Sequence, residues 1–201
     1  MIRSIAHVGT ANPRNAFTRA SAMPDQTYAT PTDDQMAWRD ASAEPGTLPP
    51  HLVAFLQCGV DPILGARRND GRPLVGAGVG CRVADKNIVR VFVPYRQNTE
   101  LLEALRSGSA VAATFSRARD HRSIQLKAST AGVDEPQPDD LCEIARQCAI
   151  ATDELVKLSY TRIQAASHHA YEPGDLKVVS FTPERVFTQT PGPGAGAELK
   201  R

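Results

Sequence analysis

Polar side chains alternate with apolar ones near the middle of the chain, and this stretch carries its strongest chemical signal. Ser123, Gln125 and Lys127 are separated by Ile124 and Leu126. Because side chains on a strand point to opposite faces with a period of two, the three polar groups share one face of a predicted strand. A row of hydroxyl, amide and ammonium groups suits an anion or the polar edge of a planar ring. The same pattern also occurs on ordinary half-buried strands with one solvated face.

A second candidate is the polar turn formed by Arg96, Gln97 and Asn98, which follows a β-branched stretch and precedes a short helix. A helix N-terminus offers unpaired N–H groups and the positive end of a dipole. Arg96 adds a planar guanidinium suited to phosphate. A solvated arginine and an asparagine that only caps the helix would give the same pattern. If the two candidates lie close in the fold, Arg96 can converge on one anion with Arg122 and Lys127.

Hydrophobic periodicity and turn residues predict the elements that position these groups. Helices are predicted over residues 48–57 and 98–108 and from residue 138 onward, continuing with a break toward residue 168. Strands are predicted over residues 61–67, 74–83, 88–93, 110–116 and 122–130, with a closing hairpin over 176–187. No βαβαβ series occurs. The order favours a mainly β or α+β fold, an antiparallel barrel with a few flanking helices.

The composition describes one globular domain without a bulk charge signal. The chain has 201 residues, of which 41% are apolar and 22% charged, and its formal net charge is +1. This charge gives no electrostatic case for nucleic acid or an anionic membrane. No apolar run reaches the ~20 residues that span a bilayer, and the N-terminus lacks the apolar core of a secretory signal. The four cysteines form no CxxC pair and are expected to be free thiols in a cytoplasmic protein.

Three segments are expected along the chain. Residues 1–47 show no sustained period and are predicted to be a disordered extension, some of which could precede the true start of the protein. Residues 48–190 form the predicted domain, and residues 191–201 a Pro/Gly-rich tail that cannot hold regular structure.

Two further motifs are interpreted as structural features and not as functional sites. Gly76, Gly78 and Gly80 miss the dinucleotide-binding fingerprint, and within a strand they indicate a bulge or a close approach of a flat ligand or another backbone. The adjacent His168 and His169 are expected to diverge on a helix or strand, which makes a shared metal ion awkward, and they are interpreted as a pair at a helix end that interacts with the C-terminal dipole. No metal site is predicted.

The sequence also resembles a known family. The segment from Thr114 to Lys127, with Thr-Phe-Ser followed by His-Arg-Ser-Ile-Gln-Leu-Lys, is similar to the pyridoxamine 5'-phosphate oxidase-related family of FMN-binding split barrels. The order of elements over residues 91–127 and the ending over residues 186–196 are similar as well. The resemblance covers about residues 48–197.

The resemblance implies a split barrel, usually a homodimer with the flavin at the subunit interface, that acts as an FMN-dependent oxidoreductase on an unidentified small molecule. By position, Arg96, Gln97 and Asn98 match the turn that contacts phosphate or ribityl. The strand that holds the flavin is matched by Arg122, Ser123, Gln125 and Lys127.

The chain departs from the family pattern in places. Ala128 stands where the family often has glycine, and Gln97-Asn98 replaces a Ser-x-Lys turn. The Arg-Leu-His-Asp-Arg-like sequence of true pyridoxamine-phosphate oxidases does not occur, so that activity is not predicted. Two alternatives stay open. One is a non-catalytic binding or sensor module that carries flavin, haem or nothing, whose haem form would need His121, His168 or His169 as a ligand. The other is a deazaflavin-dependent reductase.

Overall fold

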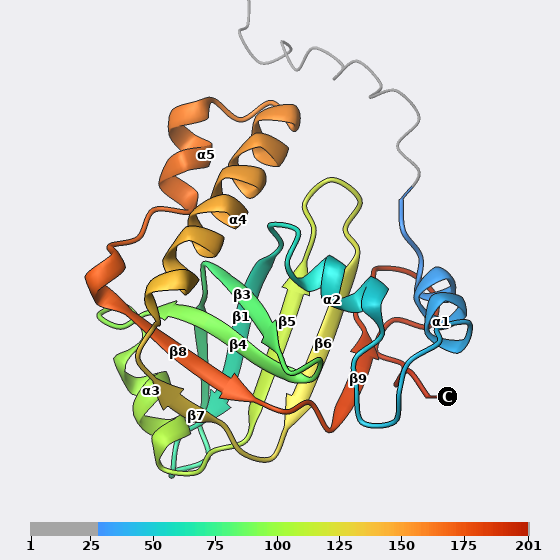
Figure 1. The fold of residues 1–201 in the computed structure, drawn as a ribbon, viewed down its shortest axis with the longest axis horizontal. Helices are drawn as coiled ribbons and strands as arrows, with labels where there is room; N and C mark the ends of the chain where they lie inside the picture. The colour runs from blue at the N-terminus through green and yellow to red at the C-terminus, as the bar shows by residue number, and fades with distance from the viewer. Residues whose placement is uncertain (1–27, 201) are drawn as a thin grey trace, which may run out of the picture.

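Nine strands in two antiparallel sheets form the centre of the molecule in the computed structural model, which describes residues 28–200 (Figure 1). The five-stranded sheet has the order β2-β1-β5-β6-β9, and the four-stranded sheet has the order β3-β4-β8-β7. Their bounds are β1 Asp61–Arg67, β2 Pro73–Ala77, β3 Gly80–Ala84, β4 Ile88–Pro94, β5 Val111–Ser116, β6 Ser123–Ala128, β7 Gly132–Asp134, β8 Leu176–Phe181 and β9 Arg185–Thr188. The two separate antiparallel sheets confirm the predicted split-barrel fold class.

Five α-helices flank the sheets (Figure 1). Figure 1 shows α4 and α5 side by side at one end of the sheets, α3 at the opposite end, and α1 beside β9. Their bounds are α1 Pro31–Arg39, α2 Pro50–Leu56, α3 Thr99–Arg106, α4 Pro138–Lys157 and α5 Arg162–His168, with a short 3-10 helix at Pro173–Asp175.

The core lies between the inner faces of the two sheets, and α2 and α3 close it with apolar stripes. Leu52, Phe55 and Leu56 of α2 are buried, and so are Leu101 and Leu105 of α3. They share one continuous cluster with buried residues of both sheets. Burial of such side chains contributes about 1.5–3 kcal/mol each, so these two helices fix the spacing of the strands they cover.

The single strand predicted over residues 74–83 is wrong, because the chain breaks there and enters both sheets. β2 pairs with β1 in one sheet, whereas β3 pairs with β4 in the other. Gly78 lies at the crossing, where an added Cβ would stand 2.9 Å from the carbonyl oxygen of Phe92. Gly78 therefore marks a close approach of two backbone segments, as its position in a strand pattern indicated, whereas Gly76 and Gly80 lie against the side chains of Asn98 and Gln147.

The closing hairpin predicted over residues 176–187 is also wrong. β8 pairs with β4 and β7, whereas β9 pairs with β6 in the other sheet. Pro183 lies between them and cannot donate to a ladder. The segment therefore connects the two sheets.

The prediction that residues 1–47 form a disordered extension is wrong for the part of that segment that the structure describes. Residues 1–27 lie outside the described range, but α1 forms at residues 31–39. A reciprocal capping box starts this helix: the Thr30 hydroxyl accepts from the Asp33 N–H, and the Asp33 carboxylate accepts from the Thr30 N–H. Asp34 is then buried against Arg122, which lies just before β6, and Thr190, which lies just after β9.

The C-terminal tail packs on the fold although it holds little regular structure. Gly196 donates its N–H to the Thr188 carbonyl at 2.7 Å, and Leu199 donates to Val186 at 2.8 Å. Leu199 is itself buried. The predicted boundary at residue 190 therefore does not separate a free tail from the domain.

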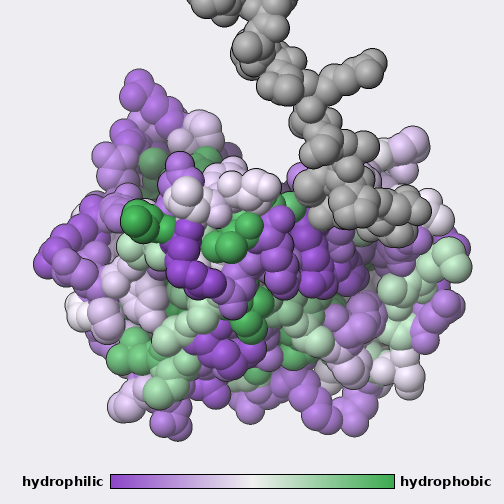
Figure 2. Space-filling model, turned by 90° about the horizontal axis from the view of Figure 1, so that it is seen from above, coloured by the Kyte–Doolittle hydropathy of each residue, from purple (hydrophilic) through white to green (hydrophobic). Residues whose placement is uncertain are grey.

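Other features of the described residues agree with a globular protein. Within residues 28–200, no helix combines the length and the apolar character needed to cross a bilayer. Figure 2 shows a face on which hydrophilic residues dominate and hydrophobic ones occur in small separate groups. All four cysteines are free thiols, as predicted.

Candidate functional site

The polar row predicted on residues 122–127 lies on the outer face of the five-stranded sheet. In the register of β5 and β6, Thr114 lies opposite Gln125, and Ala112 opposite Lys127. Gln125 donates its amide to the Thr114 hydroxyl at 2.9 Å, and its oxygen accepts from the Gln189 amide at 3.4 Å. A polar ladder thus crosses three adjacent segments and fixes the Gln125 amide.

Lys127 continues this face toward β9. Its ammonium lies 4.5 Å from the centroid of the Phe187 ring. Among residues 28–200, no carboxylate pairs with it. A cation held by a ring and lacking a counter-ion keeps its charge available for an anionic ligand.

Ser123 is placed differently from its two neighbours in the row. It is buried, and its hydroxyl donates to the Ser116 hydroxyl at 2.9 Å and contacts the carbonyl of His121 at 3.1 Å. The hydroxyl therefore ties the end of β6 to β5.

The floor beside the polar ladder consists of small and apolar residues on β1, β2 and β5. Ile63 of β1 is 42% exposed and Val75 of β2 is 74% exposed. Gly65 and Ala112 lie between Val75 and Lys127 in the paired registers, and Ile63 lies in the neighbouring row, which leads through Thr114 to Gln125. An exposed apolar strip beside fixed polar groups is a surface suited to a planar ring or a partner chain.

Arg122 lies on the opposite, inner face of the sheet. Its Nε donates to the Asp34 carboxylate at 2.7 Å, and its guanidinium lies 4.6 Å from the centroid of the Phe55 ring. Its side chain is only 17% exposed. Arg122 and Lys127 therefore face different environments, and the structure does not bring them to a shared anion.

The predicted turn before α3 serves two different purposes. Arg96 is exposed and forms ion pairs with Glu172 and Asp175, and Gln97 is also exposed. Asn98 is buried and makes no side-chain cap; its amide donates to the carbonyls of Pro94 and Ala77. This asparagine holds the end of β4 to β2.

The structure does not join this turn to the polar ladder. β4 and β5 belong to separate sheets, and no hydrogen bond or ion pair within residues 28–200 connects Arg96 with β6. The expected convergence of the two candidates on one anion therefore has no support in the contacts.

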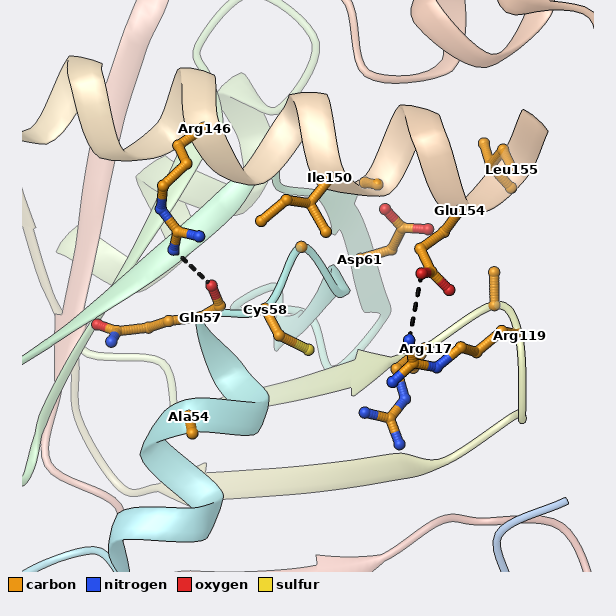
Figure 3. A pocket seen from close by; sticks show the side chains of 13 residues that line it. Ala54, Gln57, Cys58, Asp61, Arg117, Arg119, Arg146, Ile150, Glu154 and Leu155 are labelled. Carbon is orange, nitrogen blue, oxygen red and sulfur yellow. Dashed lines mark hydrogen bonds and ion pairs between the residues drawn. The ribbon is translucent and has the colours of Figure 1, made fainter. Parts of the chain in front are cut away.

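A cavity of about 390 Å³ lies on the side of the sheets covered by α4, and the sequence did not predict it (Figure 3). Figure 3 shows side chains from α2, α4 and the loop after β5 around it. Its charged and thiol-bearing lining consists of Cys58, Asp61, Arg117, Arg119, Arg146 and Glu154. The arginines of the charged turn after residue 116 were the available signal, but only the packing of α4 brings them to the cavity.

Most charges of this cavity are already compensated. Arg117 makes a two-point contact with Asp120, and Arg146 with Glu143. Arg119 donates to one oxygen of Glu154. The other oxygen of Glu154 is buried and has no hydrogen-bond partner within the described residues.

The buried thiol of Cys81 and the half-buried thiol of Cys148 are poor nucleophiles. Burial raises the pKa of Cys148 to about 11, and the nearby Asp61 carboxylate adds to this effect. Burial also raises the pKa of Cys81 well above its usual range. Because the thiolate is the reactive form, neither thiol fits nucleophilic catalysis.

The predicted place of His168 and His169 at a helix end is confirmed, but the expected divergence of their side chains is wrong. The two rings lie with centroids 4.9 Å apart at 85°, and Nε2 of His169 is 2.8 Å from a carboxylate oxygen of Asp61. The pair stands where α5 ends, so the backbone leaves the helical path between them. His121, the third histidine considered, is exposed and stacks on Tyr28.

Comparisons with known proteins give fold-level likeness. No protein-family model matches the chain, and no curated protein matches its sequence. Among solved structures, a candidate pyridoxamine 5'-phosphate oxidase from Lactobacillus delbrueckii is 20% identical, with a TM-score of 0.44, and the match covers 73% of this chain and 98% of that one. A pyridoxamine 5'-phosphate oxidase-related, FMN-binding protein from Nostoc punctiforme is 8% identical, with a TM-score of 0.41 and coverage of 71% and 85%.

An F420 reductase is 13% identical, with a TM-score of 0.41, and the match covers 66% of this chain and 93% of that one. Structures named for the family that the sequence resembles are thus among its structural neighbours. At these identities the likeness concerns the fold, and binding must be argued from the chain's own residues.

Proposed function

We propose that the outer face of the five-stranded sheet binds a flavin, with FMN as the reference cofactor, and that the chain is a flavin-dependent oxidoreductase acting on a small molecule. The observation that carries this proposal is the polar ladder through Gln125, continued by the uncompensated Lys127, beside a flat apolar floor. A flavin combines the same features: a planar apolar ring, a polar ring edge and a phosphate.

The residues present fit such a cofactor. Gln125 is held by hydrogen bonds on both sides, so its amide is fixed before a ligand arrives. Lys127 supplies a charge for the phosphate. Ser123 and Arg122 support β6 from its buried side, by contacts with Ser116 and Asp34. We therefore assign direct cofactor contacts to Gln125 and Lys127, and a supporting role to Ser123 and Arg122.

The turn before α3 is a second set of proposed contacts. Arg96 and Gln97 are exposed, and Arg96 keeps its guanidinium at the surface in ion pairs with exposed Glu172 and partly buried Asp175. The pair with Glu172 is exposed on both sides, and such surface pairs contribute about 0–1 kcal/mol, so a phosphate can compete with Glu172 for the guanidinium. Asn98 would act through the backbone geometry that it fixes.

The redox chemistry would belong to the flavin, which exchanges electrons with the substrate when bound. The protein binds and orients the ring and excludes water from it. Within residues 28–200, the contacts single out no acid or base beside the polar ladder as a proton donor or acceptor for a substrate, so we name no catalytic residue.

A second copy of the chain is the proposed cover for the apolar floor. Ile63 and Val75 expose large apolar side chains on neighbouring strands, and exposed apolar strips of this kind mark contact surfaces. A homodimer would enclose the ring between two such faces. The four free thiols fit a reducing compartment, so we propose a cytoplasmic location.

Titration of the purified chain with FMN, followed by quenching of flavin fluorescence, tests the proposal. Lys127→Ala should weaken binding by at least about 10-fold, since a charge-assisted hydrogen bond contributes about 1.5–3 kcal/mol. Gln125→Ala should weaken it less, by about 2- to 10-fold, since a neutral hydrogen bond contributes about 0.5–1.5 kcal/mol. The matched control is Lys157→Ala, an exposed lysine of α4 outside both sheets, which should bind like the wild type. Equal affinity of all four proteins would sink the site assignment.

A further inference from the structure

A carboxylate and two imidazoles meet at one end of the sheets, outside the residues assigned to the flavin. Asp61 is the first residue of β1, His168 is the last residue of α5, and His169 caps that helix. One ligand atom from each residue lies within 4.8 Å of the others. Nε2 of His169 is 2.8 Å from Oδ1 of Asp61, and Nε2 of His168 is 3.9 Å from Oδ2.

The hydrogen bonding of His169 orients its ring toward this point. The residue is 7% exposed, and its Nδ1 lies 3.2 Å from the carbonyl oxygen of Ala165. A carbonyl only accepts, so Nδ1 carries a proton and a neutral ring presents the Nε2 lone pair to the Asp61 carboxylate. Two acceptors at 2.8 Å repel unless they share a cation, which is either a second ring proton or a metal ion.

The arrangement around His169 is the one that metal-ligating histidines show. Such histidines donate their other ring N–H to a carbonyl or carboxylate, which fixes the tautomer and the ring orientation. Here the carbonyl of Ala165 has that role. The ring is therefore oriented before any ion binds.

We propose that Asp61, His168 and His169 form a site for a divalent transition-metal ion, with Zn²⁺ as the probe. Two imidazole nitrogens and one carboxylate oxygen are the ligands that zinc accepts in sites with an open fourth position. At zinc–ligand distances of about 2.0–2.2 Å in a tetrahedron, the donor atoms stand about 3.4 Å apart. The separations of 2.8 Å to Oδ1 and 3.9 Å to Oδ2 lie on either side of this value, and the three ligand atoms lie within 4.8 Å of one another, so the side chains have to rotate toward one another to close around an ion.

The surroundings leave the ion accessible. The side chain of His168 is 62% exposed, so an ion can enter from solvent. Asp61 also lines the cavity described above, and Figure 3 shows it on the same side of that cavity as Glu154, below α4. The open coordination position would be filled by water or a small anion.

Equilibrium dialysis of the full, untagged chain against Zn²⁺ after chelator treatment, with bound metal measured by elemental analysis, tests the site. We expect one ion per chain. Asp61→Asn, His168→Gln and His169→Gln should each weaken Zn²⁺ binding by at least about 10-fold. Loss of a residue that only hydrogen-bonds a metal ligand already lowers metal affinity by about this factor. His51→Gln is the matched control, because His51 of α2 contributes no atom to this group, and it should bind like the wild type.

Titration with Co²⁺ gives a second measurement, which remains informative if one of the buried variants fails to fold. The wild type should develop visible absorption bands of a low-coordinate site, and the exposed His168→Gln variant should lose them. Failure of the wild type to bind Zn²⁺ at micromolar concentration would overturn the proposal and leave a protonated His169–Asp61 pair. Zn²⁺ binding that persists in Asp61→Asn would overturn it too, as an adventitious ion only. None of these outcomes depends on flavin binding.

Discussion

Asp34 connects the N-terminal helix to the strand that carries the proposed flavin contacts, and Asp34→Asn tests that connection. The carboxylate is 2% exposed. It accepts from Nε of Arg122 at 2.7 Å, from the Thr188 hydroxyl at 2.7 Å and from the Thr190 hydroxyl at 2.6 Å. The substitution keeps the shape of the side chain and removes its charge, so it creates almost no cavity.

The expected cost follows from what remains after the substitution. The Arg122 side chain is only 17% exposed and loses its counter-ion. Breaking one partner of a buried ion pair costs about 3–5 kcal/mol. With a urea m-value of about 2 kcal/mol/M, the unfolding midpoint should fall by about 2 M.

Urea unfolding followed by circular dichroism measures this change. Asp40→Asn is the control, because Asp40 is an exposed residue at the end of the same helix, and it should change the free energy of unfolding by less than about 0.5 kcal/mol. A loss below about 1 kcal/mol for Asp34→Asn would refute the reasoning, since α1 would then not be anchored through this carboxylate.

Two further predictions concern packing and pH. Gly76→Ala should destabilise the chain by about 1–3 kcal/mol in the same assay, because the new Cβ would stand 2.1 Å from Oδ1 of the buried Asn98. Gly174→Ala is the control and should be nearly neutral, since Gly174 has open space around it. Equal effects of the two substitutions would contradict the packing argument. Burial raises the pKa of Asp140, but the Gln137 N–H and two arginines outweigh it and hold that pKa below its usual range. The stability it contributes is therefore present above the unfolded pKa of about 3.9 and is lost as pH falls through the folded pKa. Asp140→Asn should have a lower free energy of unfolding than the wild type at pH 7, and this free energy should fall less as the pH is lowered. The same fall with acid in both proteins would count against the argument.

Local pattern was sufficient for elements whose apolar spacing agrees with their final environment. The predicted strands at residues 61–67 and 88–93 and the helix at residues 48–57 appear with nearly the same bounds. The break at Gly78 and the split of β8 from β9 depend on which sheet each strand joins, and that choice is made by long-range packing.

The candidate site was predictable to the same extent. The period of two placed Gln125 and Lys127 on one face and Arg122 on the other, and the structure has this arrangement. The Asp34 partner of Arg122 was not predictable, because it lies 88 residues away on a helix stabilised by a capping box and polar contacts more than by apolar spacing. His169 likewise meets Asp61 only because α5 ends beside β1.

The most direct test of the central claim is an absorption spectrum of the purified chain after addition of FMN and gel filtration. The account predicts that the protein peak carries the visible bands of a flavin, and that Lys127→Ala elutes largely without them. A wild-type peak without flavin bands would contradict the proposed function, and a Soret band in their place would assign the chain to a haem-binding class.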